Sequence, residues 1–204
     1  MERTVYAKLT TCIVLGLAVS SLCVGQSYTP QPFSADITVI GKNASENMTG
    51  KYYFSPPNFR MDVNAKGHKM SSILDGNTQT NYMVMHDQRM YMEMHTNQPN
   101  PMMFPLPKVE NAYDLNKPCA AARRGGTCQK VGTEMINGRL CDKWQGVSAQ
   151  GTDTLWLDQK LHIPMKTVGP DGRGMELSKV VEGKADASLF QPPAGYRKMD
   201  LGVK

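Results

Sequence analysis

The stretch NYMVMHDQRMYMEM, residues 81–94, is the strongest indication of the fold, because two short alternating runs flank the polar tetrad from His86 to Arg89. If the runs pair as a hairpin with a two- or four-residue loop, Met85 lies opposite Met90 and Met83 opposite Met92. Met94 extends the same side, and the other side carries Tyr82, Val84, Tyr91 and Glu93. Thioether side chains are unbranched and re-pack easily, so five methionines on one face indicate a binding surface for an irregular apolar partner. The alternative is an ordinary sheet core that happens to use Met.

The same two-residue period recurs along the chain. Apolar Phe33, Ala35 and Ile37 alternate with polar residues, which is typical of half-buried strands. Similar runs follow at 48–54, 59–63, 130–136, 140–147, 154–158, 163–168 and 175–181. Turn-forming residues such as Lys66-Gly67 separate them. We therefore expect a mainly β protein, in which about eleven antiparallel strands form one strongly curved sheet, a half-barrel, with little helix.

Residues 96–127 interrupt this rhythm. Five prolines in the segment exclude a central strand, whereas Met102, Met103 and Phe104 are too apolar for a solvated linker. A long irregular connection inside a compact domain is usually functional. We predict that residues 96–127 form a lid, an insert loop in which these three residues are the mobile cover. The alternative is a loop that merely plugs one end of the barrel.

The N-terminus predicts export. Arg3 and Lys8 precede an apolar stretch that ends in small residues near Gly25. This pattern is typical of a secretory signal peptide, here residues 1–25. The rest of the chain, 26–204, has the size of one domain. We expect the mature protein to be periplasmic or secreted.

A second hairpin is predicted at Asn137-Gly138, because this dipeptide favours a two-residue turn. The implied register pairs Ile136 with Arg139, Met135 with Leu140, Glu134 with Cys141 and Val131 with Trp144. Cys141 would then lie far from Cys128.

Three cysteines, Cys119, Cys128 and Cys141, would meet an oxidising compartment after export. The hairpin register favours a disulfide between Cys119 and Cys128, which would contribute ~2 to 3 kcal/mol for so short a loop. Cys141 would be left free, or would pair with Cys119 instead. A zinc or redox site is a poorer interpretation, because the sequence contains no CxxC motif.

Other chemistry receives little support from the sequence. The formal net charge of +5 is mild and scattered, which argues against a nucleic-acid partner. The chain contains no GxSxG, HExxH or GxxxxGK[ST] motif, and its four histidines lack a partner pattern. We therefore expect no enzyme, no cofactor and no assigned metal site. As an alternative, the methionines with His86 or His95 would bind Cu(I) or Ag(I), since soft ligands favour these ions.

Three segments carry a resemblance to a known superfamily: Phe33-Ser34-Ala35-Asp36-Ile37, the run Trp156-Leu157-Asp158 with Leu161 to Lys166, and Leu189 to Tyr196. In these the chain resembles the outer-membrane lipoprotein carrier (LolA/LolB-like) superfamily and, within it, a branch of exported bacterial proteins. The resemblance implies a strongly curved antiparallel sheet around an apolar cavity that holds acyl chains. Domain 26–204 would be a single LolA-like β domain.

The resulting expectation is a carrier for a hydrophobic ligand, a lipid or an acyl chain, that acts as a monomer with transient contact to envelope membrane proteins. The residues expected to line the cavity are Met83, Met85, Met90, Met92, Met94, Phe33, Ile37, Phe59 and Met61. A filled interior would instead indicate a cell-envelope scaffold.

Overall fold

The computed structural model describes residues 31–95, 118–119 and 125–199. The predicted signal peptide therefore lies outside the described residues, as does most of the predicted lid. The strands are β1 (Phe33–Ile40), β2 (Met48–Ser55), β3 (Asn58–Ala65), β4 (His68–Asp75), β5 (Thr80–Met85), β6 (Met90–His95), β7 (Thr127–Ile136), β8 (Arg139–Ser148), β9 (Gly151–Asp158), β10 (Pro164–Val168), β11 (Gly174–Glu182) and β12 (Arg197–Lys198). Among the described residues they are accompanied by two short 3-10 helices, η1 (Ala44–Glu46) and η4 (Ala187–Phe190).

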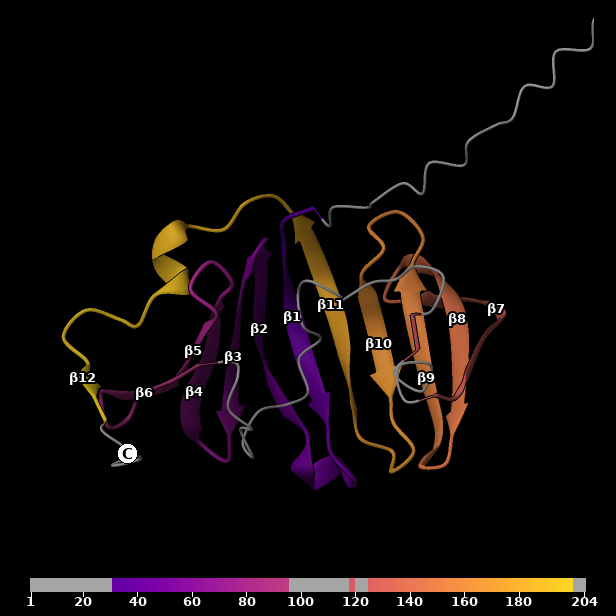
Figure 1. Cartoon of the computed structure of the whole chain (residues 1–204), viewed down its shortest axis with the longest axis horizontal. Coiled ribbons are helices and arrows are strands. Elements are labelled where there is room, and N and C mark those ends of the chain that lie inside the picture. Colours follow the sequence, from indigo (N-terminus) through magenta and orange to yellow (C-terminus); the bar gives the residue numbers. More distant parts are fainter. Residues whose placement is uncertain (1–30, 96–117, 120–124, 200–204) are drawn as a thin grey trace, which may run out of the picture.

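The twelve strands of the described ranges all belong to one curved, open sheet in the order β12-β6-β5-β4-β3-β2-β1-β11-β10-β9-β8-β7 (Figure 1). Every neighbouring pair is antiparallel except β12, which pairs with β6 in parallel. The predicted fold class, a mainly β protein with one curved antiparallel sheet, is confirmed. The strand beyond the expected eleven is the two-residue β12. In the described part of the chain no helix is long and apolar enough to cross a membrane.

Short turns join the strands because their residues adopt the backbone that tight turns require. Asn137 and Gly138 both have positive φ, 48° and 82°, which a two-residue turn between β7 and β8 favours. The predicted register holds for three pairs, Ile136–Arg139, Met135–Leu140 and Glu134–Cys141. The fourth pair is wrong: a bulge between Lys130 and Gly132 leaves Val131 unpaired and places Lys130 opposite Trp144.

The buried side chains form two clusters, one on each side of the sheet's β3–β5 region. The larger cluster includes Phe33, Ile37, Phe59 and Met61 and continues into β9–β11. The smaller one comprises Ile73, Val84 and Phe190, with Tyr53, Tyr82, Tyr91, Ala185 and Tyr196 packed against it. Phe190 belongs to η4, so the C-terminal segment, residues 185–199, covers the sheet on that second side.

Candidate functional site

The apolar face is the side of the sheet that carries Phe33, Ala35, Ile37 and Val39 of β1. Side chains of directly opposed residues on neighbouring strands project to the same side, so the strand register traces this face across the sheet. One row runs through Met92, Met83, Ser72, Met61, Tyr52 and Ala35. The next runs through Met94, Asn81, Leu74, Phe59, Phe54 and Phe33.

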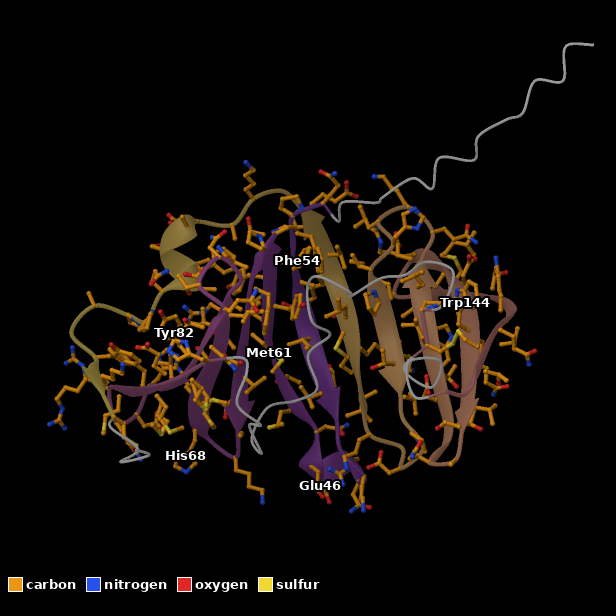
Figure 2. All side chains as sticks on the ribbon, in the orientation of Figure 1. Glu46, Phe54, Met61, His68, Tyr82 and Trp144 are labelled. Carbon is orange, nitrogen blue, oxygen red and sulfur yellow. A yellow bond between two sulfur atoms is a disulfide. The ribbon has the colours of Figure 1, made fainter. Side chains whose placement is uncertain are left out.

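The methionine hairpin has the predicted register. Met85 lies opposite Met90 and Met83 opposite Met92. The nine residues that the sequence assigned to a ligand surface all share the apolar face: Met83, Met85, Met90, Met92, Met94, Phe33, Ile37, Phe59 and Met61. Figure 2 shows Phe54 and Met61 over the middle of the sheet, with Tyr82 toward its β4–β6 end.

Burial varies along this face. Phe33, Ile37, Phe59, Met61 and Met83 are buried. The other four methionines of the hairpin are only partly buried, so between β1 and β6 the face becomes more accessible toward its sulfur-rich end. The predicted cover residues Met102, Met103 and Phe104 lie outside the described residues.

Tyr52 occupies the centre of the face and links its aromatic side chains. Its ring stacks on Phe33 and on Phe59, with ring centroids 5.7 and 6.0 Å apart. Burial raises the pKa of Tyr52, so its hydroxyl stays protonated at neutral pH and adds no charge to the surface.

Sequence reasoning missed Met70, which completes a third row on the apolar face, Met70–Met85–Met90. The sequence could have predicted this position, because Met70 lies four residues before the apolar Leu74 and alternation places both side chains on the same face of one strand. The two histidines suggested as metal partners do not join this row. His95 pairs with Thr80 on the opposite face, and His86 contacts Ser71 there. Among the described residues, no three His, Cys, Asp or Glu side chains group as a metal site.

The opposite face holds a polar network that sequence reasoning also missed. The Arg60 guanidinium donates to Asp62 Oδ1 at 2.6 Å and to Ser71 Oγ at 3.2 Å. The Ser71 hydroxyl donates to Asp62 Oδ1 at 2.6 Å. Since that proton is already bonded, Ser71 Oγ accepts from His86 Nε2 at 2.6 Å, and His86 Nδ1 accepts from the Tyr196 hydroxyl at 3.0 Å.

This network anchors the C-terminal segment. Arg60 also donates from Nη1 to the Leu189 carbonyl at 2.9 Å, and Tyr196 lies edge-on to the His86 ring. Ser71 is fully buried, with 0% of its surface exposed, and its hydroxyl proton is bonded to the Asp62 carboxylate. A nucleophilic serine needs an accessible hydroxyl, so these contacts indicate a structural role. Burial, and then the charge of Arg60, lower the pKa of His86, so the imidazole is neutral at neutral pH.

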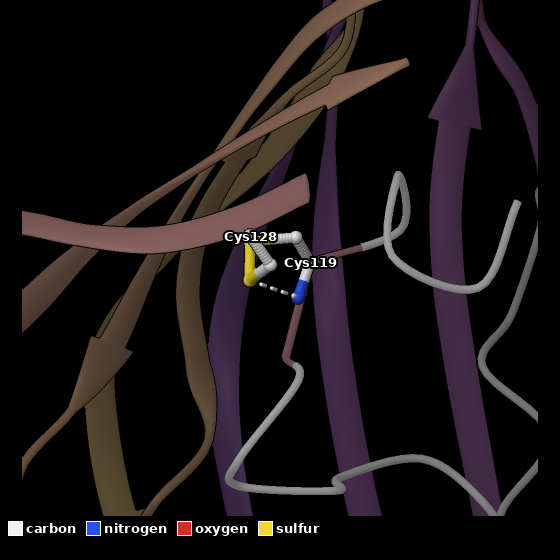
Figure 3. The surroundings of a disulfide bond; sticks show 2 residues. All are labelled: Cys119 and Cys128. Carbon is white, nitrogen blue, oxygen red and sulfur yellow. Dashed lines mark hydrogen bonds between the residues drawn. A yellow bond between two sulfur atoms is a disulfide. The ribbon is translucent and has the colours of Figure 1, made fainter. Parts of the chain in front are cut away.

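The predicted disulfide is present. Cys119 and Cys128 are bonded, and the Cys119 amide donates to Cys128 Sγ at 3.2 Å (Figure 3). Cys141 is free and buried, and burial raises the pKa of its thiol to about 11. A thiol of this kind is protonated and poorly reactive at neutral pH.

Next to Cys141, the Asp158 carboxylate is held by Arg139. Arg139 Nε donates to Asp158 Oδ2 at 2.6 Å, and the Leu161 and Lys160 amides donate to Oδ1 at 2.5 and 2.9 Å. Burial alone would raise the pKa of Asp158, but these hydrogen bonds outweigh burial and lower it. The arrangement fixes the β9–β10 connection and is structural in character.

Several solved structures align with this one. An uncharacterised conserved protein from Thermus thermophilus aligns with a TM-score of 0.56 and 10% identity, over 83% of this chain and 90% of that one. A chain from the Pseudomonas aeruginosa MucA/MucB complex aligns with a TM-score of 0.50 and 15% identity, over 80% of this chain and 56% of that one. Lipoprotein LppX of Mycobacterium tuberculosis aligns with a TM-score of 0.39 and 13% identity, over 74% of this chain and 84% of that one.

The Thermus and Pseudomonas likenesses show a shared fold and transfer no ligand or partner to this chain. No curated protein matches its sequence. Residues 36–163 match a protein family described as a domain of unknown function, DUF4412. Because this match covers more than half of the 204 residues, the protein belongs to the DUF4412 family.

Proposed function

We propose that the protein is an exported carrier, periplasmic or secreted, that holds a lipid or a single acyl chain on its apolar face, as the resemblance to lipoprotein carriers implies. The observation that carries the proposal is the composition of this face. Phe, Ile and Met side chains from six consecutive strands project to one side, and the partly exposed methionines lie at its β5–β6 end. Partly exposed, adaptable thioethers suit a flexible apolar guest.

The energetics fit a reversible carrier. Each buried methylene contributes ~0.8 kcal/mol, so a chain of roughly sixteen carbons gains on the order of 10 kcal/mol. Association costs are estimated at about 4 to 15 kcal/mol. Toward the lower end of these costs, one chain binds modestly and reversibly, which suits a carrier.

Export is supported by the Cys119–Cys128 disulfide, since structural disulfides persist in oxidising compartments. The proposal assigns residues 1–25 to a cleaved signal peptide and residues 26–204 to one carrier domain. It includes no catalytic activity.

Native mass spectrometry of the protein purified from its own host tests the proposal. We expect a co-purifying lipid or fatty acid of defined mass, and uptake of an apolar fluorescent dye once the ligand is stripped. Protein that carries no lipid and takes up neither fatty acid, phospholipid nor dye would rule out the carrier.

A pair of neighbouring variants localises the binding surface. Met92→Gln places an amide on the apolar face, whereas Glu93→Gln changes the opposite face. For a partly buried Met we expect the first variant to weaken dye binding by about fivefold. The second should leave it unchanged, because its side chain does not reach the ligand.

The Met70–Met85–Met90 row supports one second candidate, a soft-metal site for Cu(I) or Ag(I). Titration with Ag(I) tests it without a reductant. The triple change of these residues to Leu keeps the surface apolar and close in volume, so it should abolish ion binding and preserve dye binding. Absence of stoichiometric Ag(I) binding to the unchanged protein would end this candidate.

A further inference from the structure

Asn81 is a polar exception on the apolar face. It lies in β5, directly between Met94 of β6 and Leu74 of β4, and only 1% of its surface is exposed. Its Oδ1 accepts a long hydrogen bond of 3.4 Å from the Ser72 hydroxyl. Its Nδ2 is buried and has no hydrogen-bond partner.

A buried amide donor without an acceptor is rare, because the group loses its hydration and gains nothing in return. A Leu at this position would continue the row of Leu74 and Phe59 without that cost. The other buried side-chain donor without a partner in the described part of the chain is Trp144 Nε1. Its register through Leu155, Thr167, Met175 and Val39 places it on the same face of the sheet.

We propose that Asn81 is the polar anchor of the ligand: Nδ2 donates to an acceptor oxygen of an acyl group, either a free carboxylate or an ester carbonyl. The inference rests on the proposed carrier function and narrows the ligand to an amphiphile. The acyl chain lies on the Met and Phe side chains that surround Asn81 on the face, and its oxygen satisfies the orphaned donor. A pure hydrocarbon leaves that donor unpaired and is bound less well.

Three probes of matched chain length separate these cases: palmitate, methyl palmitate and hexadecane. Displacement of an apolar dye from the ligand-free protein gives their relative affinities. We expect both oxygen-bearing probes to bind about 5- to 150-fold more tightly than hexadecane, the range expected for pairing one buried polar group. Preference for palmitate over its methyl ester would identify a carboxylate, and equal affinity would show that a carbonyl is sufficient.

Asn81→Leu is the matched variant. It should remove the preference for oxygen-bearing probes while hexadecane binding is retained or improved. Ser72→Ala, which removes the neighbouring hydroxyl and keeps Nδ2, should preserve the preference. The comparison of probes on the unchanged protein does not depend on how any variant folds.

The proposal is overturned if the unchanged protein binds all three probes equally, or if the preference survives in Asn81→Leu. Either result would leave the carrier function in place. Failure of the protein to bind the dye, phospholipid and all three probes would instead remove the carrier function, and the anchor with it.

Discussion

Replacing Arg60 with Met should release the C-terminal segment from the sheet. Arg60 is 8% exposed, and its guanidinium bonds Asp62, Ser71 and the Leu189 carbonyl. The last of these is the hydrogen bond that ties η4 to β3. Met retains most of the apolar stem, so the change removes the charge and its donors with little loss of packing.

The size of the stability loss depends on the groups that lose their hydrogen bond to Arg60. Hydrogen bonds from a charged group contribute about 1.5 to 3 kcal/mol each. The Asp62 side chain is 31% exposed, so water can replace its lost partner and the full penalty of a buried, unpaired charge does not apply. We expect a loss of about 2 to 4 kcal/mol, and at about 2 to 4 °C per kcal/mol for a domain of this size the melting temperature should fall by roughly 4 to 16 °C.

Urea denaturation measures the loss, and hydrogen exchange locates it. The amides of Leu189 and Gln191 bond within η4 and should exchange faster in Arg60→Met, while the β7–β9 amides keep their protection. Arg173→Met is the control, since Arg173 pairs with Asp171 in an exposed turn and should cost less than about 0.5 kcal/mol. A change below about 1 kcal/mol in Arg60→Met, with unaltered exchange in η4, would refute the anchoring role.

Further predictions concern pH, a buried ion pair and the disulfide. Burial and then the Arg60 charge lower the pKa of His86, so as the pH falls this histidine is protonated in the unfolded chain before it is protonated in the folded protein. The free energy of unfolding should therefore fall as the pH drops below about 6.5. In His86→Gln, urea denaturation at several pH values should show a weaker dependence in this range. Arg139→Met leaves the Asp158 carboxylate buried with only its backbone donors, so the free energy of unfolding should drop by about 2 to 4 kcal/mol. Adding Asp158→Asn, which removes the unpaired charge, should recover part of this loss. Removing the disulfide by paired alanine substitution should cost about 2 to 3 kcal/mol in the same assay. An unchanged midpoint of denaturation would contradict the structural role assigned to each group.

Local patterns predicted the strands and their hairpins well. The alternation of Met with Tyr, Val and Glu around His86 specifies both the turn and the side on which each methionine lies. Asn137-Gly138 likewise sets the β7–β8 register near the turn. Such pairings connect residues close in sequence, so period and turn chemistry are sufficient to define them.

Features that depend on distant strands were missed. The bulge at Val131 shifts the register far from the turn; Gly132 beside it was a signal, because a glycine inside a strand often marks a bulge. The contact of Arg60 with Leu189 joins positions 129 apart in sequence, so it depends on where the C-terminus crosses the sheet. Asn81 could have been found, because it is an amide in the same alternating set as Met83 and Met85.

The pairing of β1 with β11 in the middle of the sheet joins strands that are far apart in sequence. Strands β1 to β6 pair in sequence order, as do β7 to β11, and the two runs meet only where β1 pairs with β11. Pairings of such long sequence separation form slowly. During synthesis β1 therefore has no partner on this edge until β11 has been made. An unpaired strand edge is a template for aggregation. A chain truncated before β11 would leave two half-sheets, one with β1 and the other with β10 as an additional unpaired edge.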